Sequence, residues 1–169
     1  MASIAPSQAH TKPLSPDWFE QAMALAALVL LACVAVALAK GAGELPKVPL
    51  FVQLHLVTIV TALALTPIML LRRRGDRFHR RLGTIWVSAM LATALLSLGI
   101  RGSLPGGFSF IHILSVWTII QVPLIWWTAR SHQVARHRSA VRGMVFGALL
   151  IAGFFTFPFD RMLGRWLFS

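Results

Sequence analysis

Four of the six histidines in this sequence recur at matched spacings. His79 follows His55 by 24 residues, and His137 follows His112 by 25 residues. The first histidine of each pair lies in a similar phrase, LHLVT around His55 and IHILS around His112, and the second lies beside arginine. Histidine is rare inside membranes and is a common protein ligand of haem iron. The repeat therefore makes these four side chains candidate ligands of a cofactor iron.

The elements that position these histidines are predicted to be membrane-spanning helices. Of the 169 residues, 57% are hydrophobic and 12% are charged, a balance that excludes an ordinary soluble domain. Apolar runs of 19 to 22 residues are long enough to cross a bilayer as helices. The sequence predicts an all-α membrane protein with five such spans, at residues 21–39, 50–71, 82–100, 108–129 and 141–159.

The distribution of charge predicts the orientation of the chain. The net charge is +11, and ten of the 16 lysines and arginines lie in two short segments, 72–81 and 130–142. The positive-inside rule makes both segments cytoplasmic, so we expect the N-terminus inside and the C-terminus outside the inner membrane of a bacterium. Residues 1–20 are then a flexible cytoplasmic tail and residues 21–169 a single transmembrane domain. The expected partner of the basic loops is lipid and not nucleic acid, because short loops hold no reading domain.

The first span has an alternative interpretation as a cleaved signal peptide. Residues 37–39, Ala-Leu-Ala, resemble a signal-peptidase site. The polar segment before this span is long and carries Asp17 and Glu20, and the apolar run exceeds a usual signal core. These features favour a span that is retained.

Matched prolines predict that one helical hairpin is used twice. Pro67 lies 12 residues after His55, and Pro123 lies 11 residues after His112. Short connections make consecutive spans antiparallel neighbours. We therefore expect spans two to five to form an antiparallel four-helix bundle whose halves are related by a pseudo-two-fold axis along the membrane normal.

In such a bundle the histidines form two pairs at opposite faces of the membrane. His55 and His112 lie near the outer ends of the second and fourth spans, on one diagonal of the bundle, where their rings can bind one iron from both sides. His79 and His137 lie about three residues outside the apolar runs, at the inner face. If these two helices extend by one turn, the inner pair can also bind an iron; if they do not, both histidines are interfacial residues beside lipid headgroups.

Arginines beside the inner pair are candidates for binding acidic groups. They would neutralise the propionates of a haem by charge-assisted hydrogen bonds, or they would contact lipid headgroups. The candidates are Arg80, Arg81, Arg138 and Arg142. We find no constellation of serine, cysteine or carboxylate side chains that indicates a catalytic residue for hydrolysis or covalent catalysis.

Three phrases carry a resemblance to a known family: HRRLGTIW at residues 79–86, GGFSFIH at residues 106–112 and RHR at residues 136–138. They resemble, over roughly residues 45 to 160, a bacterial family of predicted membrane proteins of unknown function, the domain of unknown function 2306 type. In architecture, the diagonal pairing of histidines is similar to the cytochrome b561 group, whose members pass electrons across a membrane between two haems. That similarity implies one or two b haems in this chain, an outer haem on His55 and His112 and an inner haem on His79 and His137.

Two functions of different classes follow from these observations. The first is a b-type haem protein, a haem-dependent membrane oxidoreductase, that carries electrons between a quinol or another donor and an acceptor. The second is a haem-free structural or assembly subunit of a larger membrane complex. Quinone, such a complex and a second copy of the chain are the candidate partners besides lipid. Transport is less favoured, because no acidic residue lies centrally in a span.

Overall fold

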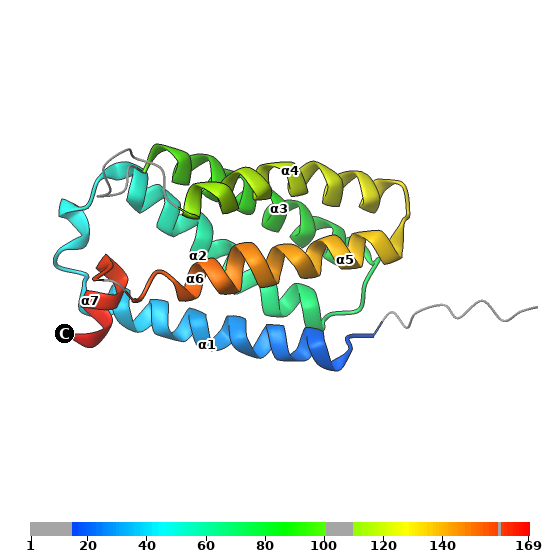
Figure 1. Cartoon of the computed structure of the whole chain (residues 1–169). Coiled ribbons are helices and arrows are strands. Elements are labelled where there is room, and N and C mark those ends of the chain that lie inside the picture. The colour runs from blue at the N-terminus through cyan, green and yellow to red at the C-terminus, as the bar shows by residue number, and fades with distance from the viewer. Residues whose placement is uncertain (1–14, 101–109, 159) are drawn as a thin grey trace, which may run out of the picture.

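A computed structural model describes residues 15–100, 110–158 and 160–169 of the chain. Within these residues the structure is helical and contains no strand. The longest helices are α1 (Trp18–Lys40), α2 (Leu50–Leu71), α3 (Arg77–Gly99) and α4 (Phe110–Arg130). The shorter elements are η1 (Leu45–Lys47), α5 (Val134–Met144), η2 (Val145–Ile151), α6 (Ala152–Phe154) and α7 (Met162–Phe168). The all-α class is therefore as predicted (Figure 1).

Four of these helices are long and apolar enough to cross a membrane: α1, α2, α3 and the part of α4 from His112 to Arg130. They overlap the first four predicted spans, and α2 has the predicted bounds of residues 50–71. Their outer faces carry exposed Leu25, Val57, Ile113 and Ile120. Such apolar side chains face outward in a protein whose solvent is lipid.

The fifth predicted span, at residues 141–159, differs from the structure. Three consecutive elements, α5, η2 and α6, cover residues 134–154, and the middle one has π-helical hydrogen bonding. The helical stretch begins seven residues earlier than predicted and ends at Phe154. Hydropathy did not reveal the start at Val134, because the first turns of α5 are rich in arginine.

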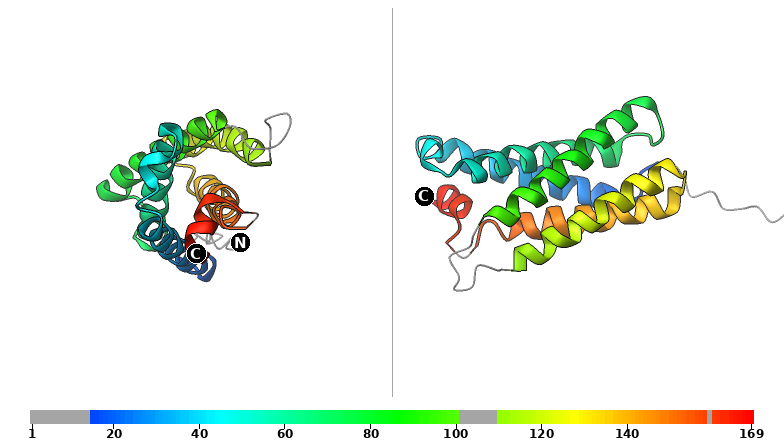
Figure 2. Two further views of the ribbon diagram at one scale, coloured as in Figure 1. Left: turned by 90° about the vertical axis from the view of Figure 1, so that its left-hand side faces the viewer. Right: turned by 90° about the horizontal axis from the view of Figure 1, so that it is seen from above.

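The hairpin repeat determines which helices are neighbours. Helix α2 packs against α3, α3 against α4, and α4 against α5, as short connections require. Helix α1 packs against both α2 and η2, so it forms a wall of the bundle (Figure 2). The structure thus places five helical rods around one interior, where the sequence predicted a four-helix bundle with α1 outside it.

The two hairpins turn in the same way at one end of the bundle. Gly75 lies between α2 and α3 with a φ of 89°, and His132 lies between α4 and α5 with a φ of 55°. Each follows the first histidine of its hairpin by 20 residues, from 55 to 75 and from 112 to 132. Both residues adopt the left-handed conformation, which reverses the chain tightly. We call this end, which holds the two arginine-rich segments 72–81 and 130–142, the arginine-rich end.

The start of α1 lies at the arginine-rich end and is fixed by its own cap. The side chain of Asp17 accepts a hydrogen bond from the backbone N–H of Glu20, and the Glu20 carboxylate accepts one from the backbone N–H of Asp17. This capping box starts the helix at Trp18. The predicted tail of residues 1–20 is therefore too long at its C-terminal side, while residues 1–14 lie outside the described residues.

The last helix, α7, packs against α1 at the opposite end of the bundle. Trp166 is buried there, and a Cβ atom at position 41 would overlap its indole ring, so glycine is required at Gly41. The indole N–H donates to Glu44 at 2.9 Å. The Lys40 ammonium donates to the backbone oxygens of Leu167 and Ser169 at 3.0 and 2.7 Å. These contacts fix the end of the chain against the end of α1.

Candidate functional site

The interior of the bundle holds two cavities, and each contains one of the predicted histidine pairs. A cavity of about 540 Å³ lies at the arginine-rich end and is lined by His79 and His137. A second cavity of about 600 Å³ lies at the opposite end and is lined by His55 and His112. We call them the His79 cavity and the His55 cavity. Both volumes lie in the range of pockets that bind cofactors, about 300 to 1,000 Å³.

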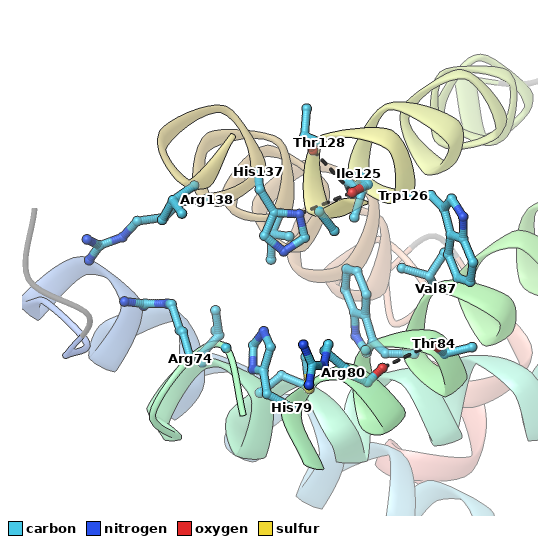
Figure 3. A pocket seen from close by; sticks show the side chains of 18 of the residues that line it. Arg74, His79, Arg80, Thr84, Val87, Ile125, Trp126, Thr128, His137 and Arg138 are labelled. Atoms are coloured by element: carbon cyan, nitrogen blue, oxygen red, sulfur yellow. Dashed lines mark hydrogen bonds between the residues drawn. The ribbon is translucent and has the colours of Figure 1, made fainter. Parts of the chain in front are cut away.

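The His79 cavity depends on two helices that begin earlier than the apolar runs indicate. Asp76 caps α3 by accepting a hydrogen bond from the backbone N–H of His79 at 2.6 Å, so α3 starts at Arg77. Helix α5 starts at Val134 and so includes His137. Both helices therefore extend beyond their apolar runs, as ligation by the inner pair requires. Figure 3 shows His79 and His137 on opposite sides of the cavity with their rings directed into it.

The ring of His137 is held in an orientation that suits a metal ligand. Its Nδ1 atom lies 3.1 Å from the carbonyl oxygen of Ile125 on α4. Burial lowers the pKa of His137, and nearby Arg74 lowers it further, against the opposing effect of this hydrogen bond. The neutral ring donates from Nδ1 to the carbonyl, which leaves the lone pair of Nε2 available. Histidine ligands of metals commonly have this second hydrogen bond.

The ring of His79 has an unsatisfied polar atom. Its Nδ1 atom is buried and finds no hydrogen-bond partner among the described residues. A buried polar atom without a partner is costly and uncommon, so the site is one where a ligand or solvent would complete the contacts.

The His55 cavity repeats the arrangement with a different helix pair. The Nδ1 atom of His55 lies 3.1 Å from the carbonyl oxygen of Thr93 on α3. The Thr93 hydroxyl donates to Thr58 at 2.8 Å, and Thr58 donates to the His55 carbonyl at 3.0 Å. His112 is 7% exposed and comes from α4. In each cavity, therefore, one histidine directs its Nδ1 atom at a backbone carbonyl of the other helix of its hairpin. These histidines are His55, which faces α3, and His137, which faces α4.

A layer of packed side chains lies between the cavities. The indole of Trp86 lines the His79 cavity and donates to the Thr66 hydroxyl at 2.9 Å, while Leu63 and Met90, one turn away, line the His55 cavity. The distance between the two histidine sites can be counted along α3. His79 lies 14 positions before Thr93, and the Thr93 carbonyl is the group that His55 contacts. At 1.5 Å per residue this is about 21 Å along the bundle.

The structure divides the four candidate arginines between different roles. Arg138 and Arg142 form ion pairs with Glu20, at 2.8 and 3.1 Å, and both also pair with Asp17. Arg80 lines the His79 cavity, whereas the exposed Arg81 is not among the residues that line either cavity. Arg138 also lines the His79 cavity, although its guanidinium points toward the start of α1 (Figure 3).

Glu20 is the residue of this region that sequence reasoning missed. It is 1% exposed and binds three guanidinium groups, those of Arg74, Arg138 and Arg142. These pairs connect α1 to the turn before α3, through Arg74, and to α5, through Arg138 and Arg142. Its capping-box position three residues after Asp17 was visible in the sequence, but its partners, 54 to 122 residues away, were not.

The donor set of each cavity fits a haem better than a bare metal ion. Within the described residues there is no group of three or more histidine, cysteine, aspartate or glutamate side chains that could hold an ion. Structural zinc needs four protein ligands and catalytic zinc usually three, whereas haem iron needs axial ligands alone. Each cavity supplies a histidine pair, mostly apolar walls and cations near one end.

Comparison of the chain with models of known families, with curated proteins and with solved structures gives no match. The resemblances drawn from the histidine and arginine phrases therefore stay predictions.

Proposed function

We propose that the protein is an integral membrane haem protein that binds one b haem in each cavity and carries electrons between a donor, such as a quinol, and an acceptor. The observation that carries this proposal is the sorting of four histidines into two cavities by alternate helices. His55 and His112 come from α2 and α4, and His79 and His137 come from α3 and α5.

The contacts of the histidines support axial ligation. A ring that donates from Nδ1 to a backbone carbonyl is fixed in tautomer and orientation, and its Nε2 atom can bind iron. His55 and His137 each have such a carbonyl at 3.1 Å. In each cavity one oriented histidine, His55 or His137, would hold the group together with the second histidine, His112 or His79.

The cofactor would supply the redox chemistry, and the chain would supply the position and surroundings of the cofactor. Haem iron, when bound, accepts and releases single electrons by cycling between the ferric and ferrous states. The chain fixes the two sites about 20 Å apart along the helices and surrounds them with apolar side chains. It also provides arginines at the end where the His79 cavity lies, with Arg80 as the candidate for a haem propionate.

The orientation that we propose follows the positive-inside rule. The arginine-rich end, with the His79 cavity, lies at the cytoplasmic face of a bacterial inner membrane, and the His55 cavity lies toward the outer face. The two sites then lie one above the other across the membrane, as electron transfer between its two faces requires.

A reduced-minus-oxidised absorption spectrum of the purified protein, expressed with ample haem, tests the proposal. We expect the α band of a b-type haem with two axial histidines. Replacing His55 and His112 together by alanine should remove part of that band, whereas replacing His10 should not, because His10 has no counterpart in the repeat. A wild-type protein without the band would contradict the proposal and favour the haem-free assembly subunit.

A further inference from the structure

The His55 cavity ends in a group of basic side chains that the histidine pair does not use. Lys47 from η1 and Arg161 and Arg165 from the segment of α7 line this cavity. All three belong to the end of the bundle where α7 packs on α1. A cavity with apolar walls and basic residues at one end suits a ligand with an apolar body and acidic groups at one edge.

Two acidic residues lie near this group, and one of them, Glu44, also lines the cavity. Glu44 accepts the hydrogen bond of the Trp166 indole. Asp160 pairs with Arg165 at 3.4 Å, on the exposed surface. Among the described residues, Lys47 and Arg161 have no carboxylate within ion-pair distance. Lys47 and Arg161, both exposed, are therefore two cations at the mouth of this cavity that form no ion pair with a described carboxylate.

We propose that Lys47 and Arg161 form the acid-binding end of the His55 cavity, where they bind the two carboxylates of a haem held by His55 and His112. This inference rests on the proposed function and assigns a new role to the C-terminal segment. A guanidinium and an ammonium group make charge-assisted hydrogen bonds with carboxylates, and such bonds are about twice as strong as neutral ones.

Helix α7 explains why Arg161 can serve in this way. Arg161 is the N-cap residue of α7. The helix is fixed by the Trp166 indole, which stacks over Gly41, and by Lys40, which binds its last carbonyl oxygens. A Cβ atom at position 164 would overlap the backbone of Phe157, so Gly164 permits the close approach of α7 to the segment before it. The chain after α6 is thus held so that Arg161 lies at the cavity.

The experiment compares two probes that differ in their acidic groups alone. Haem and haem dimethyl ester have the same ring and the same iron, but the ester has no carboxylate. Binding is measured by absorption titration of apoprotein in which His79 and His137 are replaced by alanine, so that the His55 cavity is the remaining site. We expect this protein to bind haem about tenfold or more tightly than the ester, since hydrogen bonds between charged groups exceed neutral ones by that order.

The double variant Lys47→Gln, Arg161→Gln should lose this preference and bind the ester with unchanged affinity. The variant Lys47→Gln, Arg161→Lys, which keeps the positive charge at position 161, should retain part of the preference for haem over the ester. Arg73→Gln is the matched control, because it removes one charge from an exposed residue that lines neither cavity. A double variant that retains the full preference would overturn the inference.

A second measurement covers the case in which the alanine background does not fold. In the chain with all four histidines, the double glutamine variant should weaken one of two haem-binding steps and leave the other unchanged. Two unchanged steps would overturn the inference and leave the proposed function intact. Absence of haem binding by the wild-type chain would overturn the proposed function itself.

Discussion

The two cavities contain matched histidine pairs, but different parts of the chain complete them. The His79 cavity is bounded at its end by the start of α1, where Glu20 binds one arginine of the α2–α3 turn and two of α5. The His55 cavity is bounded by α7, where Trp166 packs on Gly41. The repeated hairpins therefore supply the candidate ligands, and the unrepeated beginning and end of the chain supply the walls that distinguish the sites.

The largest effect that separates the cavities is expected from Glu20→Gln. The change leaves three guanidinium groups, two of them largely buried, without their shared carboxylate. Removing one partner of a buried ion pair costs about 3 to 5 kcal/mol. We expect a loss near the lower value in denaturant unfolding in detergent, with haem lost first from the His79 cavity.

Asp160→Asn is the control for Glu20→Gln, because its ion pair is 80% exposed on the aspartate side and should contribute less than about 1 kcal/mol. Equal effects of the two substitutions would show that the Glu20 cluster does not hold α1 in place.

Trp166→Ala should be the corresponding change at the opposite cavity. Truncation of a buried tryptophan removes its packing and costs about 3 kcal/mol or more. We expect increased accessibility of the His55 cavity, measured as faster reduction of its haem by a water-soluble reductant, with no change at the His79 cavity. Trp18→Ala is the matched control, since Trp18 is 77% exposed; a similar increase in that variant would contradict the assignment.

Thr66→Val tests the layer between the cavities and should affect the His79 cavity more than the His55 cavity, because Thr66 and Trp86 both line the former. The hydroxyl of Thr66 accepts the hydrogen bond of the buried Trp86 indole. Loss of a partner for a buried donor costs about 1 to 3 kcal/mol. The measurement is the free energy of unfolding, with the two haem affinities as a second readout. Equal losses of haem affinity at the two cavities would contradict the assignment of Trp86 to the His79 cavity.

The smallest effect is the pH dependence of the N-terminal cap. Burial raises the pKa of Asp17, but hydrogen bonds from the Glu20 backbone and the Arg142 side chain lower it below the ordinary value. A carboxylate with a lowered pKa stabilises the fold above its unfolded pKa, and this contribution is lost as the pH falls through the folded value. Stability should therefore decline below about pH 4, near the ordinary pKa of aspartate.

Asp17→Asn should reduce that decline, measured as the melting temperature between neutral and acidic pH. An unchanged pH profile in this variant would assign the acid sensitivity to other carboxylates.

Sequence reasoning predicted the elements whose signals are local. The apolar run of α2 gave its bounds of residues 50–71, and the repeated phrases gave the pairing of His55 with His112 and of His79 with His137. The placement of the latter pair depended on helix starts outside the apolar runs. Asp76, which caps α3, was visible in the sequence as a local signal that hydropathy did not weigh.

The remaining features could not be predicted because they depend on contacts between distant segments. Glu20 binds Arg142, 122 positions away, and Lys40 binds Ser169, 129 positions away. Neither residue type nor spacing specifies such partners. The inclusion of α1 in the bundle and the position of α7 followed from the assembled structure.

The ratio of haem to protein chain in three proteins tests the central claim most directly. The wild-type chain should bind two haems. The double variant His55→Ala, His112→Ala should bind one haem. The double variant His79→Ala, His137→Ala should also bind one haem, because each histidine pair serves its own cavity. A wild-type chain without haem, or two double variants that keep the full wild-type ratio, would contradict the account.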